Sequence, residues 1–302
     1  MCKNCGCSPP GGLPHHHRHD HPRDDHAHVH YDENGKPYTH THSHDHEHGH
    51  DHGQGHEQGH DHGHGHEHEH AHAHNHTETR VVPMETAILA ANDATAESNR
   101  HYFREHGIAV LNLISSPGSG KTSLLEQTLE RLKNDGVKTA VIVGDQYGEL
   151  DAERMRNRGA RVTQIQTLDS CHLNADQVAR ILPEAVPQDT ELLIIENVGN
   201  LVCPTAFDLG EDHKVALLST PEGEEKPVKY PGLFAAADIV LLTKMDLAEI
   251  LGWDRGLCLK NLSLANPAIR TIEVSVRNGL GLDRWLEYLK NLIASKKEEN
   301  KK

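Results

Sequence analysis

Residues 115–123, SSPGSGKTS, have the composition of a phosphate-binding loop. The segment follows an apolar run and opens a stretch with a helical pattern, which is the context that a P-loop requires. Small residues let backbone N–H groups turn toward phosphate oxygens, and the start of a helix favours anions. Ser115 stands where the usual pattern has its first glycine, and we expect the turn to tolerate it. The residues expected to bind nucleotide here are Gly118, Ser119, Gly120, Lys121, Thr122 and Ser123, with Lys121 at the β- and γ-phosphates and Thr122 on Mg²⁺.

Two carboxylates follow predicted strands. Asp145 comes directly after the strand pattern VIVG, and Glu196 ends the strand pattern LLIIE. Either carboxylate suits Mg²⁺, directly or through water, and either suits the orientation of an attacking water. The alternative is that the carboxylates cap the next element or face solvent. We assign catalytic roles to Lys121, Asp145 and Glu196, and we expect the sequence NVGN after Glu196 to sense the γ-phosphate.

The segment TKMD, which starts at Thr243, ends another apolar strand and is similar to the guanine-reading pattern N-K-x-D. A carboxylate can accept from both the N1–H and the N2 amine of guanine, and adenine offers neither donor. Asp246 is therefore the expected guanine reader, and Lys244 lays its aliphatic stem along the base. Thr243 replaces the usual asparagine. The sequence SVRNG after the next strand places Ser275 and Val276 where a base-contacting loop is expected.

The first ten residues, MCKNCGCSPP, hold three of the six cysteines. Cys2, Cys5 and Cys7 form a C-x-x-C-x-C cluster whose thiolates can converge on one ion. The α-amine is a candidate fourth ligand. This ligand set suits square-planar Ni²⁺ or tetrahedral Zn²⁺, and the residues alone leave both open. An exposed position suits an ion that is transferred.

A second thiol–imidazole set lies later in the chain. The sequence DSCHL places Cys171 beside His172 after a predicted strand, and Cys203 follows the strand LLIIE by seven residues. Both segments fall at strand ends on the nucleotide side, so a metal bound there is placed to respond to the nucleotide through residues 196–203. The alternative is that each cysteine is a small buried residue, which is our interpretation of Cys258.

Strand and helix patterns that alternate through the later sequence must position these side chains. Apolar strand patterns cover residues 108–114, 138–144, 161–165, 191–196, 214–219, 238–244 and 269–275. Helical patterns start at about Met84 and cover residues 121–134, 149–158, 174–182, 254–264 and 281–296. The alternation predicts an α/β fold of the P-loop NTPase type, with a mostly parallel sheet and helices on both faces. Ligands then bind at the carboxyl ends of the strands.

The composition divides the chain into three segments. Twenty-five of the 29 histidines lie between His15 and His76, in a tract too poor in apolar residues to form a core. We expect residues 1–14 to be a metal-binding head, residues 15–80 a disordered His-rich tract, and residues 81–302 one domain. Imidazole suits nickel, zinc and copper alike, so the tract is typical of a metal buffer.

Charge and hydropathy exclude two classes of partner. A formal net charge of -15 at pH 7 argues against a nucleic-acid binder, which is usually basic. No apolar run approaches the roughly 20 residues of a membrane span, and no signal pattern opens the sequence, so we expect a cytoplasmic protein. In a reducing compartment, six cysteines indicate metal or catalytic thiols rather than disulfides.

The cysteine head, the His tract, SSPGSGKTS, DSCHL, ENVGNLVCP and TKMD occur in this order over essentially the whole chain. Together they resemble the hydrogenase nickel-incorporation GTPases, the HypB family. The resemblance implies a P-loop GTPase of the SIMIBI class, related to the urease accessory GTPase, whose homodimer is promoted by GTP or metal. It also implies a tight nickel site at Cys2, Cys5 and Cys7, and a nickel or zinc site near the dimer interface at Cys171, His172 and Cys203.

The function that the resemblance implies is a slow regulatory GTPase that uses GTP, Mg²⁺, Ni²⁺ and Zn²⁺. It would deliver nickel to the large-subunit precursor of a [NiFe]-hydrogenase through a zinc-bearing accessory protein, with storage by the His tract. Two alternatives stay open, a P-loop kinase with a small-molecule acceptor and a metal-storage protein with an incidental GTPase domain. A kinase needs an arginine-rich lid, and residues 221–233 contain no arginine.

Overall fold

The computed structural model describes residues 28–31, 37–40, 84–145, 150–168 and 170–300. The chain divides into two units, one from Pro9 to Thr79 and one that contains Arg80–Lys302. The predicted head (residues 1–14) and most of the predicted disordered tract (residues 15–80) lie outside the described residues.

The first unit contains two short strands. β1 (His28–Tyr31) pairs with β2 (Pro37–His40) in antiparallel register. Both segments contain β-branched or aromatic residues, and the sequence Asn-Gly lies between them. This combination is a hairpin signal that we did not use in the sequence analysis, because the surrounding histidines dominate the composition.

The second unit is built on a seven-stranded sheet whose paired strands are all parallel. The strand order is β5-β4-β6-β3-β7-β8-β9. The strands are β3 (Ala109–Ser115), β4 (Thr139–Asp145), β5 (Arg161–Gln166), β6 (Leu192–Glu196), β7 (His213–Ser219), β8 (Ile239–Thr243) and β9 (Arg270–Glu273). β3 is central, and its Leu113 pairs in register with Glu196 of β6. This sheet confirms the predicted fold class, and it brings the carboxyl ends of β3, β4 and β6 together.

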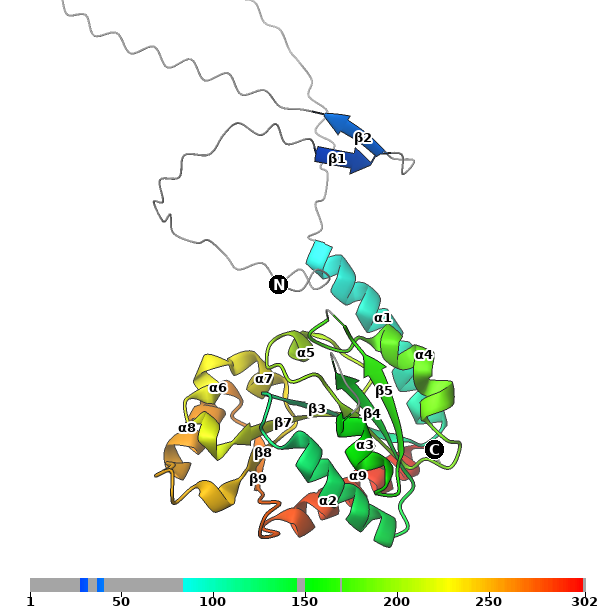
Figure 1. Cartoon of the computed structure of the whole chain (residues 1–302). Coiled ribbons are helices and arrows are strands. Elements are labelled where there is room, and N and C mark those ends of the chain that lie inside the picture. Colours follow the sequence, from blue (N-terminus) through cyan, green and yellow to red (C-terminus); the bar gives the residue numbers. More distant parts are fainter. Residues whose placement is uncertain (1–27, 32–36, 41–83, 146–149, 169, 301–302) are drawn as a thin grey trace, which may run out of the picture. The chain divides into compact units, whose positions relative to one another are not determined.

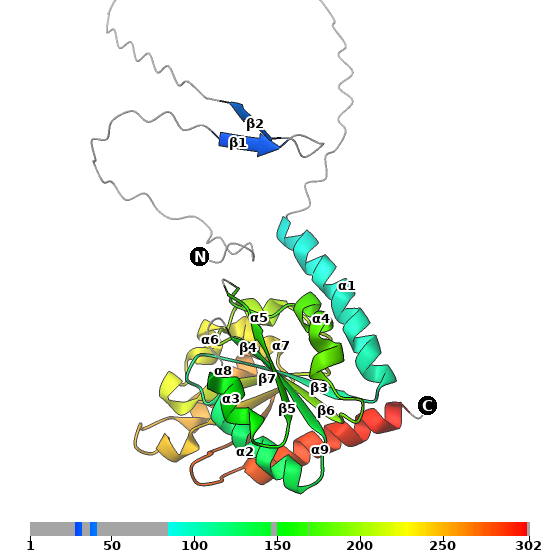
Figure 2. The ribbon, with the colours of Figure 1, turned by 45° about the vertical axis from the view of Figure 1, so that its right-hand side comes forward.

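Helices cover both faces of the sheet, as Figures 1 and 2 show. The helices on one face are α2 (Lys121–Asn134), α3 (Leu150–Arg156) and α9 (Leu282–Glu299). Those on the other are α1 (Met84–Glu105), α4 (Ala175–Ala185), α7 (Pro231–Ala236) and α8 (Arg255–Ala265). Shorter elements are α5 (Cys203–Ala206), α6 (Lys226–Lys229) and the 3₁₀ turns η1 (Thr220–Glu222) and η2 (Met245–Leu247). The sequence did not predict α5, α6 or α7.

The alternation of side chains along each strand sets the two halves of the core. In β3, Leu111 and Leu113 pack with α2 and α9. Val110 and Ile114 face the opposite way and pack with the other helices. Asn112 lies between these two and is fully buried, so an amide occupies the central strand where an apolar side chain is expected.

Local signals fix the helix that follows the sequence DSCHL. Asn174 accepts from the backbone N–H of Gln177 at 2.8 Å, and the Gln177 side chain accepts from the N–H of Asn174 at 3.0 Å. This capping box places the N-cap of α4 two residues after His172 and holds that backbone in place. Within the described part of the chain, no helix combines the length and the apolar character that a membrane crossing requires.

Candidate functional site

The phosphate loop connects β3 to α2 with the geometry that its sequence predicts. Gly118 (φ 74°) and Gly120 (φ 100°) adopt left-handed backbone conformations, which are accessible to glycine. Ser115 is the last residue of β3, where a strand conformation does not require glycine. Its hydroxyl accepts from Lys121 Nζ at 2.8 Å. The structure therefore explains why serine fits the first position of this loop.

A cavity of about 530 Å³ opens above this loop at the carboxyl ends of the strands. The predicted residues that line it are Gly118, Ser119, Gly120, Lys121, Thr122, Ser123, Asp145, Glu196 and Lys244. Lys121 is buried, and burial lowers the pKa of its ammonium against the opposing effect of the Glu196 charge. A buried cation at the start of a helix favours an anionic ligand such as phosphate.

Glu196 has an environment that fits a bound divalent cation. Its side chain is buried, and Oε1 accepts from Thr122 Oγ1 at 3.0 Å. Oε2 is buried without a hydrogen-bond partner among the described residues. Burial raises the pKa of this carboxyl group to about 7, and the positive charge of Lys121 opposes the shift. An orphaned carboxylate oxygen beside a hydroxyl is the kind of oxygen ligand set that Mg²⁺ takes.

Two residues of α3 line the same cavity and were missed in the sequence analysis. Asp151 and Arg154 extend from the helix that follows Asp145 and β4. Arg154 donates to Glu126 of α2 at 2.6 Å, and its Nη2 atom also lies 3.4 Å from Ser123 Oγ. The signal was the charged sequence LDAERMR, which begins five residues after the last residue of β4, because residues that follow the carboxyl end of a parallel strand lie at the ligand edge of the sheet.

The base-reading motif contacts the phosphate loop directly. Thr243 Oγ1 donates to the carbonyl of Ser119 at 2.7 Å, so threonine occupies the usual asparagine position with a contact of its own. Lys244 Nζ donates to the carbonyl of Gly118 at 2.7 Å. Lys244 has a left-handed backbone (φ 57°), which is uncommon for a residue with a side chain. These contacts fix the start of the loop that carries Asp246.

Asp246 and Ser275 lie together at the ends of β8 and β9. Ser275 Oγ donates to Asp246 Oδ1 at 2.6 Å, which orients the carboxylate. Val276 packs against the core on the α2 and α9 side. These three residues do not line the 530 Å³ cavity, and their contacts with a base stay a prediction.

Three candidate metal ligands meet in space although Cys203 lies 31 positions after His172 in the sequence. We call Cys171, His172 and Cys203 the Cys–His–Cys cluster. One ligand atom from each side chain lies within 4.8 Å of the other two. His172 is buried, and burial lowers its pKa to about 4, so the imidazole is neutral at pH 7 and available to a metal. Its ring packs against the ring of Phe207 at an interplanar angle of 34°, with 3.9 Å between the centroids. The arrangement suits a soft or borderline metal ion.

Comparison with known proteins places this geometry in a family. Residues 109–264 match the sequence model of the CobW/HypB/UreG nucleotide-binding domain. The chain is 49% identical over 213 residues to hydrogenase maturation factor HypB of Rhizobium leguminosarum bv. viciae, covering 70% of this chain and 71% of that one. It is also 49% identical over 212 residues to HypB of Escherichia coli K12, covering 70% of this chain and 73% of that one.

The chain belongs to the HypB family. Its structure is similar to HypB from Archaeoglobus fulgidus, with a TM-score of 0.64, 38% identity and coverage of 68% of this chain and 99% of that one. It is similar to HypB from Helicobacter pylori in complex with nickel, with a TM-score of 0.64, 34% identity and coverage of 68% and 96%. The resemblance drawn from the motifs is confirmed, and so is the assignment to the P-loop GTPases.

The remaining predicted metal ligands of this HypB-family chain are not in the described residues. Cys2, Cys5 and Cys7 lie outside them, as do most histidines of the tract. Within the described part of the chain, the Cys–His–Cys cluster is the one group of three or more candidate metal ligands. Cys258 is fully buried on α8, and burial raises its pKa to about 12, in agreement with its interpretation as a small core residue.

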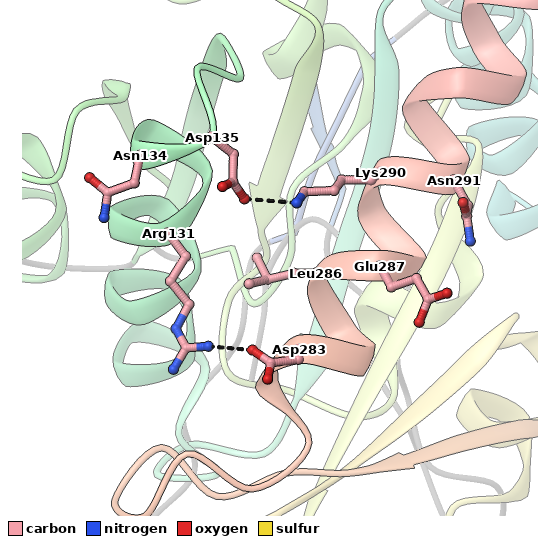
Figure 3. Close-up of a pocket in the computed structure, with 8 residues that line it drawn as sticks. All are labelled: Arg131, Asn134, Asp135, Asp283, Leu286, Glu287, Lys290 and Asn291. Atoms are coloured by element: carbon pink, nitrogen blue, oxygen red, sulfur yellow. Dashed lines mark hydrogen bonds and ion pairs between the residues drawn. The ribbon is translucent and has the colours of Figure 1, made fainter.

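A further hollow of about 620 Å³ lies between α2 and α9, away from the phosphate loop (Figure 3). Two ion pairs join the helices across it. Arg131 contacts Asp283 at 2.7 Å, and Asp135 contacts Lys290 at 2.8 Å (Figure 3). Exposed pairs of this kind contribute about 0–1 kcal/mol each to stability. We assign this groove to helix packing rather than to chemistry, because four of its five charged side chains form these two ion pairs.

Proposed function

We propose that this chain is a GTP-hydrolysing nickel metallochaperone for [NiFe]-hydrogenase maturation. The observation that carries the proposal is the Cys–His–Cys cluster, whose Cys203 ligand lies seven residues beyond the buried Glu196 of the phosphate site. One loop, residues 196–203, thus begins beside the phosphates and ends at the metal ligands. A change at the γ-phosphate that moves this loop alters metal affinity or release.

The nucleotide side of the proposal assigns each cavity residue a role. Lys121 and the amides of the phosphate loop bind the β- and γ-phosphates, and Thr122 holds Mg²⁺ with Glu196. Mg²⁺, when bound, neutralises charge on the phosphates. Asp145 and Glu196 orient water and connect the phosphates to the adjoining loops. Hydrolysis is slow and regulatory, as suits a switch rather than a metabolic enzyme.

Guanine selection falls to the ends of β8 and β9. Asp246 accepts from the two guanine donors, and the Ser275 hydroxyl holds the carboxylate in position. Lys244 covers one face of the base with its stem, and Thr243 secures the motif to the phosphate loop. Val276 completes the base loop. This assignment favours GTP over ATP, whereas the alternative function as a P-loop kinase does not require a preference for GTP.

Nickel is the proposed cargo of the Cys–His–Cys cluster. Two thiolates and a neutral imidazole suit Ni²⁺ and also Zn²⁺, so zinc occupies the site when nickel is absent. The similarity to the nickel complex of the Helicobacter pylori protein supports nickel as the functional ion. The head, through Cys2, Cys5 and Cys7, is a tight nickel site from which the ion passes on, and the tract of residues 15–80 stores nickel.

The proposed partners follow from delivery of an ion. The chain acts in the cytoplasm as a homodimer promoted by GTP or metal. It works with a zinc-bearing accessory protein and, through it, with the large-subunit precursor of the hydrogenase. No nucleic acid or membrane takes part.

Hydrogenase activity in a host that lacks its own maturation GTPase tests the proposal. Lys121→Ala and Cys203→Ser should each abolish maturation at low nickel, because the first removes the phosphate ligand and the second a metal ligand. Deletion of residues 15–76 should preserve maturation when nickel is ample. Loss of all activity on this deletion, with full activity in Cys203→Ser, would support a storage protein and contradict delivery.

A further inference from the structure

Asn197 joins the nucleotide side of the domain to the segment that carries the metal ligands. It follows Glu196 directly, and only 1% of the residue is exposed. Its Oδ1 atom accepts from the backbone N–H of Leu173 at 3.1 Å and from that of Val198 at 2.9 Å. Because Leu173 is the residue after His172, one amide side chain spans the end of β6 and the ligand segment.

Leu173 is tightly packed against the nucleotide side as well. Its side chain is fully buried over Gly144, the residue before Asp145 in β4. A Cβ atom added at Gly144 would lie 2.7 Å from Leu173 Cγ, so the backbone of β4 approaches this leucine as closely as packing allows. A displacement at the end of β4 or β6 therefore reaches the backbone beside His172.

The amide nitrogen of Asn197 is anchored in the centre of the sheet. Nδ2 donates to Asn112 Oδ1 at 3.2 Å, and Asn112 Nδ2 donates to Glu211 Oε1 at 3.0 Å. Glu211 is buried, and its Oε2 atom accepts from the N–H of Leu209 at 2.7 Å. Since Asn112 belongs to the central strand β3, this anchor stays in place when the loop after Glu196 changes.

We propose that Asn197 is the positioning residue that couples the nucleotide site to the Cys–His–Cys cluster. The proposal rests on the proposed function, since it requires a metal in the cluster and a response of Glu196 to the nucleotide. A shift of Glu196 turns Asn197 about its bond to Asn112. The Leu173 N–H either moves with its acceptor or loses this hydrogen bond. In both cases the position of the His172 imidazole relative to the two thiolates changes.

A purely structural role is the alternative, because many buried amides only satisfy backbone groups. Asn99 of α1 provides a matched control for that role. It is also buried, and its Nδ2 atom donates to the carbonyls of Ala175 at 2.9 Å and Leu209 at 3.1 Å. Asn99 thus braces the start of α4 from the α1 side, whereas Asn197 braces the same segment from the nucleotide side.

The test measures nucleotide affinity of the full chain with and without nickel, by fluorescence titration of labelled nucleotides. The readout is the ratio of the Kd for GDP to the Kd for a non-hydrolysable GTP analogue. Nickel bound in the His-rich tract has the same effect on the Kd ratio in every variant. The difference between the unsubstituted chain and Cys203→Ser therefore gives the contribution of the cluster. In the unsubstituted chain nickel should change the ratio about fivefold or more, and Cys203→Ser should abolish the change.

Asn197→Ala should reduce the nickel effect to less than about twofold, and Asn99→Ala should keep it. Thermal unfolding checks that both variants fold, and nickel–thiolate absorption, measured as a difference from Cys203→Ser, checks that the cluster still binds nickel. If Asn197→Ala does not fold, Asn112→Ala takes its place with the same expectation, because it removes the acceptor of the Asn197 amide.

A full nickel effect in the Asn197 or Asn112 variant overturns the role of Asn197. An equal loss in Asn99→Ala also overturns it, since general loosening of the ligand segment then explains the result. Absence of a nickel effect in the unsubstituted chain is a different failure, because it contradicts the proposed coupling of GTP to metal itself.

Discussion

At the scale of single residues, the site consists of buried polar groups whose charges are incompletely matched. Burial raises the pKa of Glu196 to about 7 and lowers that of Lys121. Each charged form is therefore disfavoured until an opposite charge arrives. A triphosphate with Mg²⁺ brings a cation to the carboxylate and an anion to the ammonium, so ligand binding stabilises the charged form of both residues.

Glu196→Gln should alter the pH dependence of stability in the nucleotide-free protein treated with a chelator. The pKa of Glu196 is about 7 in the fold against an ordinary value of 4.5. Between these values the folded state keeps a proton that the unfolded state has lost, so Glu196 makes the free energy of unfolding fall as the pH rises. The total effect is roughly 3 kcal/mol.

Urea titrations of the variant and the parent chain measure this effect. The variant lacks the carboxyl group, so its advantage in the free energy of unfolding should grow by about 3 kcal/mol from pH 4.5 to about pH 7.5. Parallel profiles for the two proteins would show that Glu196 titrates normally.

Asp246→Asn tests the guanine reader. The carboxylate only accepts hydrogen bonds, whereas the asparagine amide also carries a donor group. This NH₂ group faces a donor in guanine, which is unfavourable, but it can donate to the carbonyl that xanthine has at the same position. The variant should lose GTP affinity by at least about 100-fold and should bind xanthosine triphosphate instead. Asp283→Asn, at an exposed position on α9, is the matched control and should leave nucleotide affinities unchanged. An unaltered preference for GTP in Asp246→Asn contradicts the assignment.

At the scale of elements, parallel strand order explains why distant residues meet. β4, β6 and β3 are adjacent in the sheet, so Asp145, Glu196 and the phosphate loop share one edge. The segment after β5 supplies Cys171 and His172, and the loop after β6 supplies Cys203. The sheet therefore places the Cys–His–Cys cluster and the phosphate loop at the same edge, although their motifs are far apart in the sequence.

The sequence predicts those parts of this arrangement that have a periodic pattern of apolar residues or a known motif. Strands such as residues 239–243 are apolar runs, and their alternation with helices fixes the fold class. α5, α6 and α7 are too short to show a helical period. The contact between Asn112 and Asn197 depends on cross-strand register and on side-chain direction, which the sequence does not specify. A polar residue within the apolar run IAVLNLI was the available signal.

Helix α9 should be essential for stability through Trp285. This side chain is fully buried, and its Nε1 atom donates to Thr128 Oγ1 of α2 at 3.1 Å. Trp285→Ala should lower the free energy of unfolding by about 3–5 kcal/mol, because it leaves a cavity and removes the hydrogen bond that Thr128 Oγ1 accepts. Leu264→Ala, at an exposed site on α8, should change it by less than about 0.5 kcal/mol. Equal effects in urea titrations would contradict the packing described here.

At the scale of the whole molecule, a GTPase domain follows a segment with the composition of a metal buffer. Twenty-five histidines lie between His15 and His76. In the proposed function their number sets the nickel capacity, whereas the thiolates of the head and of the Cys–His–Cys cluster set the selectivity, since soft ligands discriminate among divalent ions better than imidazole does. We therefore propose that storage and delivery belong to different parts of one chain.

Deletion of residues 15–76 should lower nickel capacity without removing the tight sites. At about four imidazoles per ion, the deletion should remove roughly six weakly bound ions per chain. Equilibrium dialysis followed by elemental analysis gives the number, and the same measurement on a Cys2/Cys5/Cys7→Ala variant should show the loss of one tight ion instead. Equal capacity before and after the deletion would show that the tract does not store nickel.

Nickel affinity at the Cys–His–Cys cluster in two nucleotide states tests the coupling of the phosphate site to the metal ligands. A full chain with Cys2, Cys5 and Cys7 changed to serine is loaded with GDP or with a non-hydrolysable GTP analogue, and nickel–thiolate absorption is followed against a competing chelator. If the two sites are coupled, the nickel affinities in the two states should differ by about fivefold or more. Superimposable titration curves in the two states would contradict this coupling, because the phosphate site and the metal site would then be independent.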